Sequence, residues 1–234
     1  MKKIAALLFL FAFCLMAADF WQKPYTEWAD KDLQRMIANS PWAHTASVSV
    51  GAQVTTPETG HGGGSGGGGG RGGGGPQGGG GGGADAPVPG IREPEVIVRW
   101  QSAMPIRQAF VRLKYGAEAG QSEDAKKYLE KEQPTYELVL SGPLQQFLRG
   151  KPDDVAKALS EVTFLTTKEK GAVKSTSIQV GKSGASMDIL IAFPRSMPYT
   201  VDDKEVEFST KLGTAAVKMK FRLKDMVYNG KLEM

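Results

Sequence analysis

Cysteine is almost absent from this chain of 234 residues, which contains only Cys14. That residue lies in an apolar N-terminal segment, so the chain that follows has no thiol. It can therefore form no disulfide or thiolate metal site and has no cysteine nucleophile. A domain of this composition must be held together by its hydrophobic core alone, and about 150 structured residues suffice for that.

Histidine is nearly as scarce, with only His44 and His61. A Ser-His-Asp triad would need one of them, and no G-x-S-x-G string is present. His44 has no clustered partners for a metal. The acidic pairs at 153–154 and 202–203 fit a first helical turn and a tight turn. We therefore predict no catalytic residue, no metal site and no cofactor.

Excess charge is also small. The formal net charge is +4, and it falls to 4 − 2 = +2 without Lys2 and Lys3. A charge this low does not indicate a nucleic-acid partner.

Residues 1–18 are typical of a signal peptide. Lys2 and Lys3 precede the apolar run Ile4–Met16, and two alanines follow it. The run is shorter than the roughly 20 residues that span a bilayer, and we expect no transmembrane helix in the mature chain. Phe13 stands where a lipoprotein signal needs a small residue, so the sequence does not favour a lipid anchor at Cys14. We expect a periplasmic or secreted protein.

Glycine dominates one internal segment, where 18 of the 22 residues from Gly62 to Gly83 are glycine. We predict a disordered loop over 61–90, because such a segment has no apolar side chains to bury. It lacks the lysine of a phosphate-binding loop. Alternating stretches at 47–54 and 95–102 predict a strand on either side of it. Residues 19–60 then belong to one main domain with 91–234; the alternative is a linker between two domains.

Helical spacing predicts a first helix capped by Thr26 and ended by a left-handed Asn39. A second begins at 104–105, with Leu113 on its apolar face and Arg107 on its outer face. A third is capped by Ser122, and short helices are expected at 143–148 and 152–160. Further strands are expected at 135–142, 162–167, 175–180, 187–193, 205–212, 215–224 and 228–232. The fold class is therefore α+β, with a largely antiparallel sheet and a few helices on one face or end. The usual size of such sheets suggests six to eight strands.

The strands at 205–212 and 215–224 flank a Gly213-Thr214 turn, which predicts a hairpin. Its register places Phe208 opposite Met219 and Glu207 opposite Lys220. The second strand carries a basic stripe on one face, a possible surface for an acidic partner such as anionic lipid or an envelope polymer: Lys218, Lys220, Arg222 and Lys224. The alternative, which we favour, is a solvated or edge-protecting face.

Three tryptophans near the N-terminus form a second possible binding surface: Trp21, Trp28 and Trp42. They could stack on sugar rings of a cell-wall polymer. Helical and strand spacing around Trp28 and Trp42 favours packing in the core instead.

Several segments resemble a family of uncharacterised secreted bacterial proteins, sometimes labelled as containing a GWxTD domain. They are an opening motif over 28–36 followed by Ser-Pro-Trp-Ala at 40–43, a central Arg-Trp-Gln-Ser-Ala at 99–103, and the tail segments 203–208 and 224–232. The resemblance implies no activity, ligand or catalytic residue.

Together these features favour a non-enzymatic binding or structural component of the periplasm or cell envelope, whose partner is an unknown envelope protein or polymer. A hydrolase that uses paired carboxylates on such a polymer is one alternative. A carrier of an apolar ligand is the other.

Overall fold

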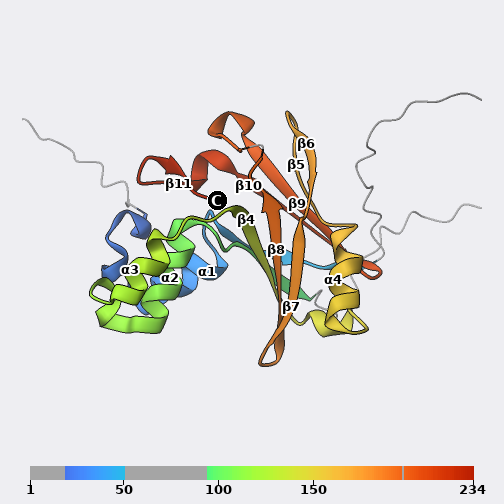
Figure 1. Cartoon of the computed structure of the whole chain (residues 1–234), viewed down its shortest axis with the longest axis horizontal. Coiled ribbons are helices and arrows are strands. Elements are labelled where there is room, and N and C mark those ends of the chain that lie inside the picture. Colours follow the sequence, from blue (N-terminus) through green and yellow to red (C-terminus); the bar gives the residue numbers. More distant parts are fainter. Residues whose placement is uncertain (1–18, 51–93, 197) are drawn as a thin grey trace, which may run out of the picture.

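The computed structural model describes residues 19–50, 94–196 and 198–234. Two five-stranded antiparallel sheets form its centre, with helices at two sides (Figure 1), which confirms the α+β class. Sheet A has the order β1-β3-β4-β8-β7, with bounds Ala43–Ser47, Glu95–Trp100, Thr135–Gly142, Ser186–Pro194 and Ser177–Ser183. Sheet B has the order β2-β10-β9-β5-β6, with bounds Ser49–Val50, Ala215–Arg222, Glu205–Leu212, Phe164–Thr167 and Gly171–Lys174.

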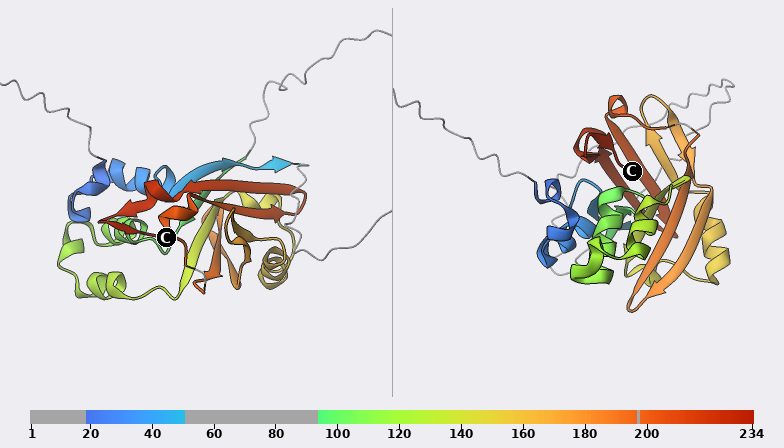
Figure 2. Two further views of the ribbon diagram at one scale, coloured as in Figure 1. Left: turned by 90° about the horizontal axis from the view of Figure 1, so that it is seen from above. Right: turned by 60° about the vertical axis from the view of Figure 1, so that its left-hand side comes forward.

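The chain crosses between the two sheets at both edges. β1 runs into β2 through Val48, and these strands lie alongside β10 in the left view of Figure 2. At the other edge β6 leads into β7. Ser175 donates its backbone N–H to the carbonyl of Thr163, just before β5 of sheet B, at 3.2 Å, and Thr176 donates to Ala192 in β8 at 2.8 Å. The expected single sheet of six to eight strands is therefore wrong, because the strands divide into two sheets that join at both edges like halves of a barrel.

Large apolar side chains fill the space between the sheets. Trp100 of sheet A packs edge-on against Phe221 of sheet B, with ring centroids 5.6 Å apart. Both residues, with Phe193 and Phe208, have no exposed surface. Burial of such aromatic rings contributes much of the stability of a core that has no disulfide.

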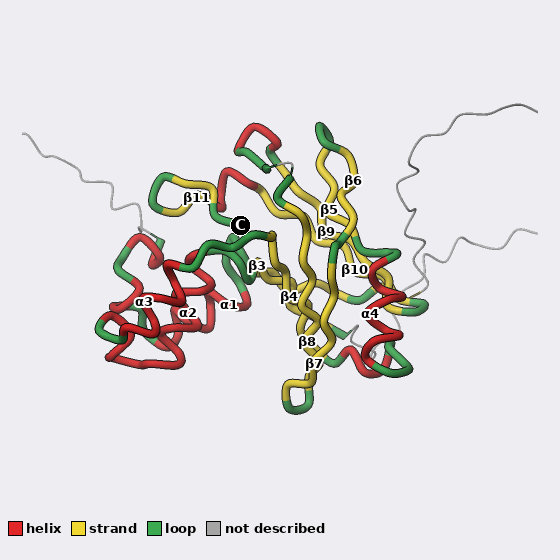
Figure 3. The backbone as a smooth tube through the Cα atoms, in the orientation of Figure 1, coloured by secondary structure: helices red, strands yellow, loops and turns green. Residues whose placement is uncertain are grey.

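The helices cover two separate sides of the sheets (Figure 3). α1 (Asp30–Ala38), α2 (Met104–Tyr115) and α3 (Glu123–Glu130) form one layer, in which α1 lies against β1 and β3. α4 (Pro152–Ser160) packs on β7 at the opposite end. The expectation of helices on only one face or end is corrected accordingly.

Two predicted helix termini differ from those observed. α1 begins at Asp30 because Thr26 lies inside a separate 3-10 turn, Tyr25–Glu27, and Asp32 accepts the N–H of Ala29 at 3.3 Å. Asn39 has a φ of −148°, so it is not left-handed. The predicted cap at Ser122 is confirmed, since its hydroxyl accepts the N–H of Ala125.

The predicted faces of α2 were wrong at two positions. Arg107 is 3 % exposed, whereas Leu113 is 42 % exposed. Arg107 donates to the backbone oxygen of Tyr128, and its guanidinium lies 4.9 Å from the centre of that ring. The packing of α3 on α2 therefore draws the arginine inward.

The β9–β10 hairpin has the predicted register, with Phe208 opposite Met219 and Glu207 opposite Lys220. β10 ends at Arg222, so Lys224 lies in the 3-10 turn Leu223–Met226 rather than on the strand. The expected strand at 228–232 is instead a small hairpin of β11 (Val227–Tyr228) and β12 (Lys231–Leu232).

The strands on either side of the glycine tract pair with each other. β1 is antiparallel to β3, with Ser47 opposite Glu95. The predicted loop at 61–90 and the predicted signal at 1–18 lie outside the described residues.

Candidate ligand-binding groove

A groove of about 850 Å³, here called the sheet B groove, lies on the outer face of sheet B. β9 and β10 form its floor, the turn between β5 and β6 forms one wall, and the segment before β9 closes one end. Its lining residues are Thr166, Thr167, Lys168, Glu169, Val201, Asp203, Lys204, Glu205, Glu207, Lys220, Arg222 and Lys224. Five of these twelve are cationic and four are acidic.

The floor alternates charge because of strand geometry. Side chains on a strand point to opposite faces in turn, so Val206 and Phe208 enter the core while Glu205 and Glu207 face outward. In the hairpin register Glu205 lies opposite Arg222 and Glu207 opposite Lys220. Acidic and basic side chains therefore lie side by side on one solvent-facing surface.

The observed ion pairs do not follow this register. Lys220 Nζ lies 3.8 Å from Glu205 Oε2, on the diagonal, and Arg222 pairs with Asp225 at 2.8 Å. Both pairs are largely exposed, and such pairs contribute only about 0–1 kcal/mol. A charged ligand can therefore replace these partners at little energetic cost.

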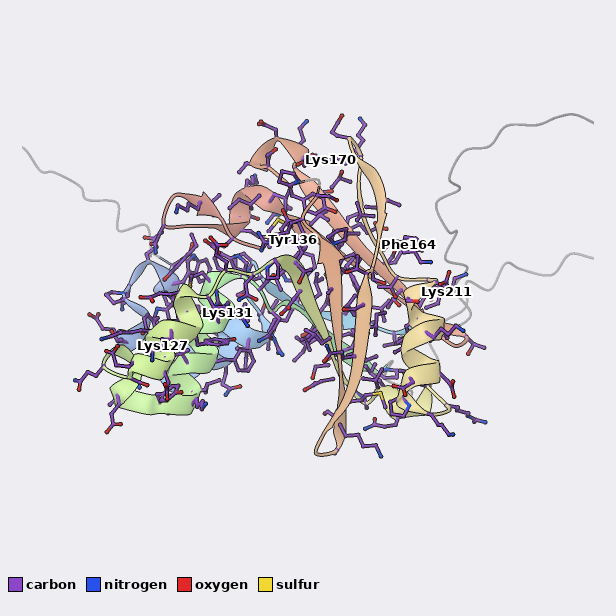
Figure 4. The ribbon with its side chains drawn as sticks, viewed as in Figure 1. Lys127, Lys131, Tyr136, Phe164, Lys170 and Lys211 are labelled. Atoms are coloured by element: carbon purple, nitrogen blue, oxygen red, sulfur yellow. The ribbon has the colours of Figure 1, made fainter. Side chains whose placement is uncertain are left out.

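The end of the groove is fixed by Asp203, whose side chain is 5 % exposed. Its carboxylate accepts from Lys170 Nζ at 2.5 Å and from the N–H of Thr200 at 2.7 Å. Figure 4 labels Lys170, which lies in the turn between β5 and β6. Desolvation alone would raise the pKa of Asp203, but these hydrogen bonds outweigh it and lower the pKa. Asp203 is therefore an ionised anchor and not a proton donor.

Lys204 follows with an uncommon backbone conformation, φ 62° and ψ −60°. These angles correspond to the strained form of the γ-turn. Its N–H donates to Val201 O at 3.1 Å, and its carbonyl accepts from the N–H of Leu223 at 2.8 Å. A residue with a side chain pays about 1–3 kcal/mol in such a conformation, so the flanking structure must impose it.

A smaller hollow of about 370 Å³ lies on the other side of β10 and shares Lys220 and Arg222 with the groove. His44 lines it, with its ring 5.0 Å from that of Phe221. Burial and the charge of Arg222 lower the pKa of His44, partly opposed by Asp225. The shared cations thus form a ridge between two depressions.

Three members of the predicted basic stripe line the groove, namely Lys220, Arg222 and Lys224. Lys218 is also exposed but is not among the lining residues. Sequence reasoning missed Lys168 and Lys204. They belong to turns, and no periodic pattern connects these turns to β10.

Two of the three N-terminal tryptophans are buried in the core. Trp28 is 1 % exposed and Trp42 is fully buried, with its indole N–H donating to Glu233 O at 2.9 Å. Trp21 is half-buried and packs edge-on against Trp42, with ring centroids 5.8 Å apart. The stacking alternative is corrected for Trp28, which packs against Phe20, and for Trp42, which packs against Tyr228 near the C-terminus. The groove lining contains no aromatic residue.

Within residues 19–50, 94–196 and 198–234, no group of three or more His, Cys, Asp or Glu could hold a metal ion. None of the helices in these ranges is long and apolar enough to cross a membrane. No family model, curated protein or solved structure matches the chain. The resemblance to the secreted family therefore stays a prediction.

Proposed function

We propose that the protein is exported and acts in the periplasm or cell envelope as a non-enzymatic binding component that holds an acidic polymer in the sheet B groove. The observation that carries this proposal is the set of solvent-facing cations in one groove: Lys168, Lys204, Lys220, Arg222 and Lys224. Of the four carboxylates beside them, Asp203 is already neutralised by Lys170. Arg222 is likewise paired with Asp225, which lies outside the lining. The remaining balance is 4 − 3 = +1, which favours an anionic ligand.

The absence of aromatic side chains from the lining favours recognition by charge rather than by stacking on sugar rings. Glu205 and Glu207 can accept hydrogen bonds from hydroxyl or amide groups of the same ligand. The groove therefore fits a polymer that carries both anionic groups and hydrogen-bond donors.

Binding of labelled polyglutamate to residues 19–234, measured by fluorescence anisotropy at two salt concentrations, tests the proposal. The double variant Lys220→Glu/Arg222→Glu should weaken binding at least tenfold, because it reverses two floor charges. Lys211→Glu is the matched control, since Lys211 lies on β9 outside the groove lining and should change affinity less than twofold. Equal binding by the double variant and the wild type, or no binding at all, would overturn the proposal.

Export is tested separately by cell fractionation of the full chain in a bacterial host. The expected product lies outside the cytoplasm and is shorter than the full chain by about the length of the predicted signal. A full-length protein confined to the cytoplasm would contradict it.

A hydrolase is the second candidate, because carboxylates stand on two sides of the groove. Glu169 lies in the turn that forms a wall, and Glu207 lies on the floor. Hydrolysis of a glycosidic bond needs two carboxyl groups about 5–10 Å apart. If it occurs, Glu169→Gln and Glu207→Gln should each abolish release of reducing ends while polymer binding persists.

Nothing in the described residues favours the third candidate, a carrier of an apolar ligand. Such a carrier needs an apolar cavity of roughly 300 Å³ or more. The two hollows described above lie on the outside; the sheet B groove is lined largely by charged side chains, and the smaller hollow contains Lys220, Arg222 and Asp225. Between the sheets, Trp100, Phe208 and Phe221 are tightly enclosed.

A further inference from the structure

We infer that Lys204, Arg222 and Lys224 together bind a phosphate group, so that the acidic polymer held in the groove is one that carries phosphate. This inference rests on the proposed function and narrows its ligand. All three residues are exposed and line the sheet B groove.

The hairpin register brings the three cations together. Arg222 lies opposite Glu205 at the ends of β10 and β9. One residue beyond these ends, the carbonyl of Lys204 accepts the N–H of Leu223 at 2.8 Å. Arg222 and Lys224 are the two neighbours of Leu223 in the chain. Lys204 therefore lies beside both of them, although it stands 18 positions before Arg222 in the sequence.

The local charge matches phosphate better than carboxylate. Asp225 pairs with Arg222, whereas Lys204 and Lys224 form no ion pair within the described part of the chain. Glu205, which lies opposite Arg222, pairs instead with Lys220 at 3.8 Å. Without that pair the sum is 3 − 1 = +2. A phosphate monoester carries about −1.5 to −2 at neutral pH, whereas a carboxylate would leave one positive charge uncompensated. Lysine is also well suited to phosphate as a point charge.

The backbone of Lys204 supplies an independent observation. The side chain of Lys204 makes no hydrogen bond or ion pair with any other described residue. The residue is exposed, so its packing adds nothing to the stability of the fold. A glycine would keep both backbone hydrogen bonds and avoid the strained φ of 62°. A side chain at a strained backbone position that has no internal partner is expected to serve a ligand.

Three variants at this position separate strain from binding. Lys204→Gly removes both the strain and the ammonium group, Lys204→Ala removes only the ammonium, and Lys204→Arg keeps the charge. We expect inorganic phosphate, titrated by calorimetry, to bind about fivefold or more weakly to the Gly and Ala variants and to retain most of its affinity for the Arg variant. The Tm should rise by about 2–6 °C for Lys204→Gly alone. Unchanged phosphate affinity in Lys204→Gly and Lys204→Ala would overturn the inference, whether or not the Tm of Lys204→Gly rises.

Binding measurements with several ligands distinguish the sources from which the phosphate group could come. Inorganic phosphate, polyphosphate and vesicles containing phosphatidic acid are compared, with acetate as the carboxylate control. Loss of binding in Lys204→Ala for phosphate and polyphosphate, but not for vesicles, supports a polymer; loss for vesicles supports a lipid headgroup. Acetate binding as tight as phosphate binding overturns the phosphate assignment.

Failure of this inference is distinguishable from failure of the proposed function. If Lys220→Glu/Arg222→Glu abolishes polyglutamate binding while Lys204→Ala leaves phosphate affinity unchanged, the groove binds acidic polymers but the phosphate site is wrong. If Lys204→Ala weakens phosphate binding and the double variant still binds polyglutamate normally, the phosphate site stands and the polymer proposal fails.

Discussion

Two arginines show how differently the outer faces of the two sheets are used. Arg99 on β3 of sheet A is 9 % exposed. Arg222 on β10 of sheet B is exposed and pairs with Asp225 at the surface. Both occupy strand positions that point away from the space between the sheets. α1 packs on sheet A and α2 packs on α1. Among the described residues, neither of these helices packs on the floor of the sheet B groove, where Arg222 is exposed.

Beneath these helices Arg99 has several partners. Its Nε donates to Gln101 at 3.1 Å, and its guanidinium lies 4.9 Å from the centre of the Phe110 ring on α2. A further long contact at 3.5 Å reaches the carbonyl of Ile37 at the end of α1. Burial lowers the pKa of Arg99, and the charge of Asp188 partly opposes this effect. Arg99 therefore serves the fold, while Arg222 remains available to a ligand.

The largest expected effect concerns the segment that holds the helical layer on sheet A. Trp42→Ala should lower the free energy of unfolding by about 3–5 kcal/mol, because it empties a fully buried site that also bonds to Glu233. Trp21→Ala is the control and should cost clearly less, since Trp21 is only half-buried. Urea unfolding measures both. Similar losses for the two variants would mean that the layer is not part of the cooperative core.

The comparison of the two arginines is tested directly by Arg99→Ala and Arg222→Ala. Arg99→Ala should destabilise by about 2–4 kcal/mol, because buried partners lose a charged donor. Arg222→Ala should cost less than about 1 kcal/mol, because it breaks only an exposed pair. Urea unfolding at neutral pH gives both values. Equal losses would contradict the distinction between a structural face and a ligand-binding face.

A smaller effect is expected at the end of the sheet B groove. Asp203→Asn should lower the free energy of unfolding by about 1–3 kcal/mol, because it weakens buried hydrogen bonds from Lys170 and Thr200. The lowered pKa of Asp203 means that this stability is present above its ordinary value of 3.8 and is lost as pH falls through the folded-state value. Thermal unfolding from pH 7 down to pH 2 measures this.

The control for that experiment is Glu161→Gln. Glu161 forms a short ion pair with Lys174, which lowers its pKa, but both side chains are exposed. It should leave the pH dependence of unfolding nearly unchanged. A wild-type acid transition that persists unaltered in Asp203→Asn would show that Asp203 does not anchor the groove.

Local patterns in the sequence were sufficient for part of this structure. The Gly213-Thr214 turn and the alternation around it fixed the hairpin register, because a shift by one residue would expose Phe208 and Phe221. The same alternation placed Lys220 and Arg222 on one outer face. It could not say whether helices cover that face, since this depends on contacts between segments far apart in the chain. Arg99 and Arg222 follow the same strand pattern with opposite outcomes.

The other cations of the groove could not be predicted from local sequence patterns, because they too depend on contacts between distant segments. Lys168 lies in the turn between β5 and β6, and β6 itself escaped prediction because Gly171–Lys174 is too short to show an alternating pattern. Lys204 is held beside the groove by a hydrogen bond to Leu223, in the 3-10 turn that follows β10. The predicted stripe also placed Lys224 on the strand, whereas the chain turns after Arg222.

The smallest expected effect is at His44, and it reports on occupation of the ridge between the two hollows. Its pKa is lowered below 6.5 by burial and by Arg222, so its contribution to stability is present above pH 6.5 and is lost as pH falls through the folded-state value. NMR titration of its ring protons, assigned with His44→Gln, should show the pKa rising in Arg222→Ala. Saturating inorganic phosphate should raise it in the wild type, because a bound anion offsets the charge of Arg222. The same addition should have no effect in Arg222→Ala, and a shift there would mean that phosphate acts on His44 without using the arginine.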